Sequence, residues 1–280
     1  MIEIKDLCKE FDGFKAVDHL NLRIETGEFF GLLGPNGAGK TTTISMISTV
    51  LLPTQGEILL DGKTLNRKAA SLKRKLSVIT QEFSMRQDMT MDEVMEYQGR
   101  LYFMPKKEIK QKTNDLFEFA GLSDFHRRTV RHLSGGMKRK LMICRGLLTD
   151  PEIMLLDEPT AGMDAVARRQ MWNLLRQLHS RGITILLTTH YIDEAQNLCD
   201  RVALINKGTL DAVDTPQALI DELGPFAVDL PSEDSLKSSY FHKREEAIAY
   251  LTEAGDDAML RNTTLEDVFV QRVGTQLTKK

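Results

Sequence analysis

The sequence predicts an α/β protein with a mainly parallel sheet, an inserted helical subdomain and a small C-terminal appendix. Strand-length apolar runs recur along the chain, and helical patterns separate most of them, which is the order that a parallel sheet requires. Between about residues 84 and 150 the pattern is helical only, which indicates the insertion. From about residue 225 this alternation of strand and helix patterns is no longer visible. We therefore expect one domain over residues 1–224 and a small α/β extension over 225–280.

The first part of the chain predicts an N-terminal antiparallel β part, then a buried strand and a helix. Ile2 and Ile4, and later Leu20–Ile24, place apolar residues at every second position, as a half-buried strand does. Glu28–Leu33 is a short apolar run that ends in a glycine-rich turn, which is typical of a buried strand. The pattern over 40–50 predicts the helix that follows it.

The remaining elements follow from similar short patterns. Thr90 and Glu93 predict a capping box that opens a helix, and Gly121 predicts the end of the next helix. Within the extension, residues 245–251 predict one more helix. Further buried strands are predicted at Leu76–Ile79, Ile153–Leu156, Ile183–Leu187 and Val202–Ile205.

Composition and charge exclude several classes of protein. Of the 280 residues, 41% are hydrophobic, which is too many for a disordered chain. Lysine and arginine number 37 against 40 acidic residues, so the basic excess of most nucleic-acid binders is missing. No apolar stretch approaches the roughly 18 residues of a membrane span, and the first residues lack the pattern of a signal peptide. Because Cys8, Cys144 and Cys199 lie far apart, we expect reduced thiols in a soluble, intracellular protein, without a disulfide framework or zinc site.

Residues 34–41, Gly-Pro-Asn-Gly-Ala-Gly-Lys-Thr, match the phosphate-loop (Walker A) motif between a strand and a helix. Its glycines let successive backbone N–H groups turn towards phosphates, and the helix N-terminus adds to this anion site. We expect Lys40 to reach the β- and γ-phosphates and the Thr41 hydroxyl to ligate Mg²⁺. A chance glycine turn before a lysine is the alternative, and the match at every position in the required context disfavours it. The predicted nucleotide ligands here are Asn36, Gly37, Ala38, Gly39, Lys40, Thr41 and Thr42.

The strand over 153–156 ends in two carboxylates, Asp157 and Glu158. Ligands of open α/β sheets lie at the carboxyl ends of the strands, so the pair is expected to face the phosphate loop. We expect Asp157 to hold Mg²⁺ through water, as a Walker B acid does, and Glu158 to polarise the attacking water as a general base. A solvated acidic turn before Pro159 is the alternative. Beside a phosphate loop, the pair predicts hydrolysis of a nucleoside triphosphate.

Four further motifs resemble, in order, those of the ATP-binding cassette (ABC) ATPases. Gln81 stands where that family has its Q-loop glutamine, and Leu133–Met137, Leu-Ser-Gly-Gly-Met, is similar to the LSGGQ signature. Gly162–Asp164 resembles the D-loop, and His190 ends a strand like the switch histidine. The signature sequence and the ending Leu265–Phe269, Leu-Glu-Asp-Val-Phe, resemble those of the family branch whose membrane partner is an ABC-2-type permease. Drug, antibiotic and nodulation-factor exporters belong to that branch.

The resemblance implies two cassettes that dimerise head to tail around two ATP molecules, each site being completed by the signature of the other chain. Ser134 would cap the signature helix, whose N-terminal N–H groups face the γ-phosphate. Adenine would stack on Phe11, for which a core position is the alternative. The implied catalytic residues are Glu158, His190 and Gln81, and the implied metal ligands are Thr41, Gln81 and Asp157. Besides the phosphate loop, the implied nucleotide contacts are Phe11, Ser134, Gly135, Gly136 and Asp164.

Two groups of residues each allow two interpretations. Lys138, Arg139 and Lys140 oppose the macrodipole of the signature helix, so they form either a solvated basic face or an attraction for the nucleotide or the permease. Four methionines at the entry to the helical subdomain fit core filling better than docking of the permease. They are Met85, Met89, Met91 and Met95.

The sequence therefore predicts the ATPase subunit of an ABC-2-type exporter. It would use ATP and Mg²⁺ and drive a separate permease, through which it would lie on the cytoplasmic face of the cell membrane. A soluble ABC ATPase acting on nucleic acid or ribosomes is the main alternative; the single phosphate loop and the net charge of -3 count against it. A regulatory module that binds ATP without turnover is a third, against which Glu158 and His190 count.

Overall fold

The structure is a computed structural model that describes residues 1–83, 85–232, 235–255 and 257–274. Six strands form its central sheet: β3 (Phe29–Leu33), β6 (Leu76–Ile79), β7 (Ile153–Asp157), β8 (Thr184–Thr189), β9 (Arg201–Asn206) and β10 (Thr209–Asp214). Their order across the sheet is β10-β9-β3-β8-β7-β6, and only the edge strand β10 is antiparallel to its neighbour. The mainly parallel α/β sheet predicted from the sequence is confirmed.

Both faces of the central sheet are buried, which explains why its strands are continuous apolar runs. Successive side chains point to opposite faces, so Phe29 and Leu33 join one core and Phe30 and Leu32 the other. The first core is covered by α5 (Gly135–Leu147), α6 (Ala165–Ser180) and α7 (Ile192–Leu198), and the second by α1 (Lys40–Ile47).

An antiparallel sheet packs on the α1 side. It consists of β1 (Ile2–Phe11), β2 (Phe14–Ile24), β4 (Gln55–Leu60) and β5 (Lys63–Thr64), in the order β2-β1-β4-β5. Asp12 and Gly13 join β1 to β2 with φ of 47° and 85°, the positive angles of a type I′ hairpin turn. The short helix α2 (Ala70–Lys73) leads from this sheet to β6.

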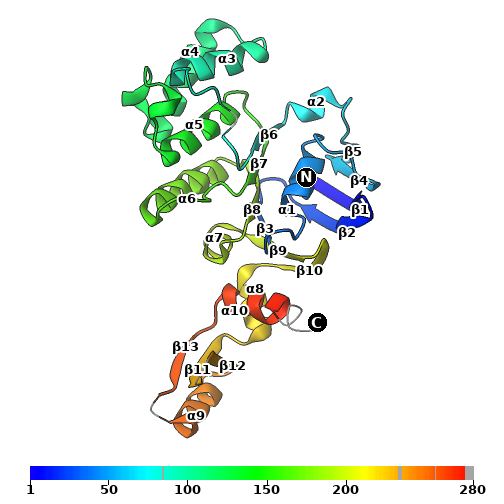
Figure 1. Cartoon of the computed structure of the whole chain (residues 1–280), viewed down its shortest axis with the longest axis vertical. Helices are drawn as coiled ribbons and strands as arrows, with labels where there is room; N and C mark the ends of the chain where they lie inside the picture. The colour runs from blue at the N-terminus through cyan, green and yellow to red at the C-terminus, as the bar shows by residue number, and fades with distance from the viewer. Residues whose placement is uncertain (84, 233–234, 256, 275–280) are drawn as a thin grey trace.

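The regular elements that the structure describes between β6 and β7 are all helices. They are α3 (Met91–Leu101), α4 (Lys106–Ala120), η1 (Ser123–Phe125), η2 (Val130–His132) and α5. The predicted capping box of Thr90 and Glu93 opens α3, and Gly121, with φ of 66°, ends α4. Figure 1 shows α3, α4 and α5 grouped at one end of the molecule. Met85, Met91 and Met95 are buried among these helices, so core filling is the right interpretation for them.

The C-terminal part forms a second small sheet and then returns to the main core. After α8 (Pro216–Leu223) come β11 (Phe226–Ser232), β12 (Ser235–Phe241), α9 (Arg244–Ala254) and β13 (Met259–Asn262), and the strand order is β12-β11-β13. Figure 1 shows this sheet and α9 at the end of the molecule opposite to α3. The following helix α10 (Leu265–Phe269) packs back, because Leu265 and Val268 are buried in the same core as α7.

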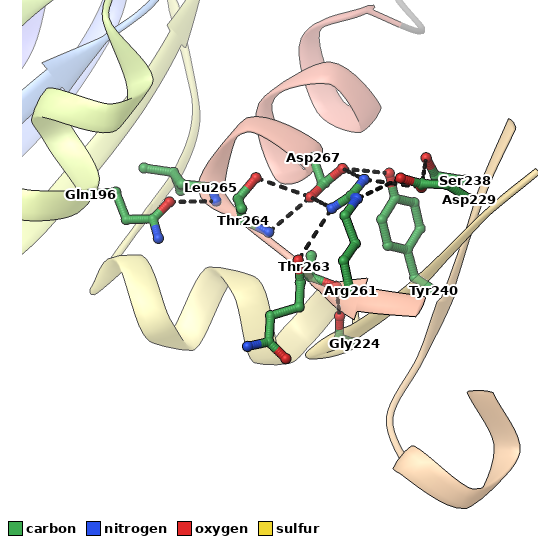
Figure 2. Close-up of polar contacts among 11 residues, drawn as sticks. Gln196, Gly224, Asp229, Ser238, Tyr240, Arg261, Thr263, Thr264, Leu265 and Asp267 are labelled. Carbon is green, nitrogen blue, oxygen red and sulfur yellow. Dashed lines mark hydrogen bonds and ion pairs between the residues drawn. The ribbon is translucent and has the colours of Figure 1, made fainter. Parts of the chain in front are cut away.

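Arg261 links this small sheet to α10, as Figure 2 shows. From β13 its guanidinium donates to Asp229 of β11 at 2.6 Å and to Asp267 of α10 at 2.7 Å. At the start of α10, the backbone N–H of Leu265 donates to Oε1 of Gln196 on α7, at 2.9 Å. The C-terminal sheet is thereby connected, through α10, to the helix that follows β8.

Candidate nucleotide site

The phosphate loop connects β3 to α1 and can be built only with glycine at Gly39. Its φ is 101°, and a Cβ atom there would lie 2.4 Å from the carbonyl oxygen of Ala16. Because α1 begins at Lys40, its first backbone N–H groups have no partner within the helix and are free to bind an anion. Lys40 is buried, and its Nζ donates to the carbonyl oxygens of Gly34 at 2.8 Å and Pro35 at 3.1 Å. Burial lowers the pKa of Lys40, and nearby Glu158 opposes that shift.

The two carboxylates at the end of β7 are buried, so they do not form a solvated turn. Asp157 accepts hydrogen bonds from the hydroxyls of Thr41 at 3.1 Å and Thr188 at 2.5 Å. The phosphate loop and the acidic strand end therefore face each other, as the rule for open α/β sheets predicts.

Glu158 lies at the centre of a polar cluster. Its Oε1 is 3.6 Å from Nζ of Lys40, and its Oε2 is 3.1 Å from Nδ1 of His190 and 3.5 Å from Nε2 of Gln81. Its φ of 47° lies in the left-handed region, which is strained for a residue with a side chain. Its backbone N–H donates to the carbonyl oxygen of Thr188 on the neighbouring strand, at 3.1 Å. Packing between strands thus holds this residue in an unfavourable conformation beside the phosphate loop.

These groups surround one open cavity of about 620 Å³, a volume typical of a small-molecule site. Of the residues predicted from the sequence, it is lined by Phe11, Asn36, Gly37, Ala38, Gly39, Lys40, Thr41, Thr42, Gln81, Glu158 and His190. Phe11 is 43% exposed at its mouth, so the core alternative is wrong. Sequence reasoning missed Phe14 and Tyr191, which also line the cavity. The type I′ turn was the available signal for Phe14, since it places Phe14 directly opposite Phe11.

The signature residues lie elsewhere. Ser134, Gly135, Gly136 and Asp164 line a second cavity of about 590 Å³, so a single chain does not bring them to Lys40. Gly162 lines both cavities. The helix cap predicted for Ser134 is present, because its Oγ accepts a hydrogen bond from the backbone N–H of Met137 at 3.2 Å.

Arg139 does not belong to a solvated basic face. It is only 2% exposed, and its guanidinium donates to the carbonyl oxygens of Thr80 at 2.7 Å and Gln81 at 3.0 Å. The same group lies 5.0 Å from the ring centre of Phe83. Arg139 therefore ties the signature helix α5 to the backbone that carries Gln81. Local sequence gave no signal for a contact between segments so far apart in the chain.

A glycine-rich loop at a helix N-terminus, facing a buried acidic strand end across one cavity, defines a P-loop nucleoside triphosphatase. A model of the family described as "ABC transporter" matches residues 17–161. The chain belongs to this family and is an ATPase. In the part of the chain that the structure describes, none of the helices combines the length and the apolar character that a membrane span needs.

Relatives with assigned names resemble this chain over nearly its whole length. The Nod factor export ATP-binding protein I of Cupriavidus metallidurans is 35% identical, over 99% of this chain and 98% of its own. The daunorubicin resistance ATP-binding protein DrrA3 of Streptomyces coeruleorubidus is 33% identical, over 95% of this chain and 93% of its own. These relatives support the exporter branch inferred from the signature and the C-terminal ending.

Solved ABC cassettes share the fold. The cbiO1 subunit of Clostridium perfringens, part of the ABC transporter complex cbiONQ, has a TM-score of 0.72 and 27% identity, covering 79% of this chain and 90% of its own. A dimeric ATP-binding cassette in a post-hydrolysis state with ADP and Pi has a TM-score of 0.69 and 27% identity, covering 77% of this chain and 98% of its own.

Proposed function

We propose that this ATPase subunit drives export through a separate ABC-2-type permease. The position of Glu158 between Lys40, Gln81 and His190 is the observation that carries the hydrolytic part of the proposal. The names of the relatives, Nod factor export and daunorubicin resistance proteins, support the direction of transport.

Each polar group at the cavity has a role that follows from its position. Glu158 would accept a proton from the attacking water, because its buried carboxylate lines the cavity beside the phosphate loop. Lys40 would exchange its bonds to the loop carbonyls for the more strongly accepting oxygens of the γ-phosphate. His190, in contact with Glu158, would donate to the same phosphate. The aromatic ring of Phe11 would stack on the adenine at the mouth of the cavity.

Residues at this cavity also fit Mg²⁺, which prefers oxygen ligands and a site shared with phosphates. The Thr41 hydroxyl and the Asp157 carboxylate lie 3.1 Å apart, and Gln81, whose amide carries an oxygen, lines the same cavity as Thr41. We propose these three residues as the metal site, with Asp157 acting through water. When bound, the ion would offset the charge that develops on the transferred phosphate.

A second cassette completes the site in this proposal. Ser134–Gly136 lie at the N-terminus of α5 but outside the cavity of Lys40, so one chain leaves this anion-binding helix end unused. Head-to-tail pairing with another copy, or with a related cassette, would place it on the γ-phosphate. The similarity to a dimeric cassette with ADP and Pi supports this arrangement.

Exposed apolar side chains gather at the end of α3, where we propose that the permease binds. Tyr97, Leu101, Tyr102 and Phe103 are 58%, 54%, 44% and 91% exposed. Tyr102 also borders a cleft between α3 and α5 that Arg145 lines. Exposed aromatic groups of this kind are typical of a protein contact. The subunit would then lie on the cytoplasmic face of the membrane, held there by the permease.

For the domain organisation, we propose that α10 belongs with the ATPase domain. The cut expected at residue 225 would strip Leu265 and Val268 from the core that they share with α7. The extension is then the sheet β11–β13 with α9, attached by α8 and by Arg261.

The test is to tag the Glu158→Gln variant, add ATP and identify the proteins that co-purify from native membranes. We expect a stoichiometric multi-span membrane protein, lost when Phe103→Ser is added. Met259→Ser is the matched control, because Met259 is 66% exposed but lies on β13, far from α3. A soluble dimer with nucleic acid or ribosomal material and no membrane protein would overturn the proposal.

A further inference from the structure

Glu194 is a fully buried carboxyl group outside the nucleotide cavity. It lies on α7 and is 0% exposed. Burial raises the pKa of Glu194, since hydrogen bonds to it only partly offset the loss of water. Burying such a group costs stability unless its contacts supply something in return.

The contacts of Glu194 join three separate elements. Its Oε1 accepts hydrogen bonds from the hydroxyl of Thr160 at 2.9 Å and from Nε1 of Trp172 at 3.1 Å. The side chain of Thr189 also acts on this carboxyl group, since it lowers the pKa of Glu194 against the effect of burial. Thr160 lies in the loop after β7, Trp172 on α6, and Thr189 at the end of β8. Both threonines are 1% exposed, so water does not compete for these bonds.

Two of these partners adjoin the reacting groups of the cavity. Thr160 is two residues after Glu158, and Thr189 is the residue before His190. Glu158 and His190 touch at 3.1 Å, and Glu158 holds its contacts against a strained backbone. Anchoring both loops to a single carboxyl group fixes the distance between these two side chains.

We propose that Glu194 is a positioning residue for ATP hydrolysis: it holds the loops of Glu158 and His190 in register through Thr160 and Thr189. The inference rests on the roles proposed above for Glu158 and His190.

Two substitutions separate positioning from charge. Glu194→Gln keeps the accepting Oε1 and the shape, so we expect kcat within about threefold of the wild type. Glu194→Leu removes the acceptor and releases both loops. Displacement of reacting groups by about 1 Å costs on the order of 10²-fold, so we expect a loss in kcat of that order while the Kd of ATP stays within about threefold.

Controls distinguish this effect from general destabilisation and from failure of the proposed function. Ile109→Ala removes a buried side chain on α4, far from both loops, and should lower Tm without lowering kcat. Trp172→Phe and Thr160→Val remove one donor each, and each should lower kcat less than Glu194→Leu does. They test the same idea if the leucine variant does not fold. Trp172 is the only tryptophan in the chain, so its emission reports directly whether the contact is intact.

Unchanged kcat in Glu194→Leu, with Glu158→Gln inactive in the same assay, would overturn this inference and leave the proposed function standing. Full activity of Glu158→Gln would instead overturn the proposed function. Equal losses of kcat in Glu194→Leu and Ile109→Ala at matched Tm would reduce Glu194 to a structural role. If the leucine variant does not fold, wild-type kcat in both Thr160→Val and Trp172→Phe would overturn the inference.

Discussion

Phe11 carries the base contact of the proposed site, and its truncation gives a quantitative test. The ring is 43% exposed at the mouth of the cavity, with Nζ of Lys9 4.9 Å from its centre. Stacking of a base on an aromatic ring contributes about 1–3 kcal/mol, which corresponds to about 5- to 150-fold in Kd. Because roughly half of the ring is already in solvent, Phe11→Ala should cost only about 1 kcal/mol of folding free energy.

The assay is ATP binding by calorimetry in the Glu158→Gln background, so that nucleotide is not consumed. We expect Phe11→Ala to raise the Kd of ATP about 5- to 150-fold and Phe11→Tyr to restore it. The binding of GTP should weaken to a similar extent in Phe11→Ala, since stacking discriminates poorly between bases. Phe14→Ala is the matched control, because Phe14 lines the same cavity and is 64% exposed. A larger effect at Phe14 than at Phe11 would refute the assignment of the stacking residue.

Three further outcomes follow from buried polar groups. Arg139→Met should lower kcat about 10-fold or more with little change in the Kd of ATP, because the backbone of Gln81 loses its hydrogen bond to Arg139. A rise in the Kd of ATP as large as the fall in kcat, measured by titration, would contradict this. Burial raises the pKa of Asp267, but Arg261 and Thr264 outweigh it and lower that pKa to about 2. The ion pair of Arg261 with Asp267 therefore stabilises the fold above about pH 4, and its contribution is lost as the pH falls from about 4 to 2. In thermal melts, the difference in Tm between the wild type and Arg261→Met should shrink over that range. Burial raises the pKa of Cys144 to about 12, so its alkylation, followed by mass spectrometry, should require unfolding; rapid labelling of the native protein would contradict its burial.

Short-range patterns predicted most of the central sheet and the positions of the nucleotide-binding motifs. The strands over Leu76–Ile79 and Ile153–Leu156 are buried on both faces, so their apolar runs are unambiguous. The phosphate loop and the Asp157–Glu158 pair were expected to meet because parallel strands present their carboxyl ends at one edge.

Features that depend on contacts between distant segments were not predictable in this way. Arg139 looks like part of a basic surface in the sequence, yet its partners Thr80 and Gln81 bury it. Glu194 looks like a helix-surface acid, and only the meeting of α6, β7 and β8 makes it a buried acceptor. The C-terminal sheet does not alternate buried and exposed residues: Ala227, Val228 and Asp229 of β11 are buried in succession, and no residue of β13 is fully buried. Its strands therefore leave no clear period-two pattern to find.

The role of Glu158 as the general base is tested most directly by the ATP turnover of Glu158→Gln beside the wild type, with ATP binding measured on the same samples. We expect a kcat lower by about 10²- to 10⁴-fold with the Kd of ATP unchanged, since only proton acceptance from water is lost. Turnover at the wild-type rate would show that Glu158 is not the general base of ATP hydrolysis.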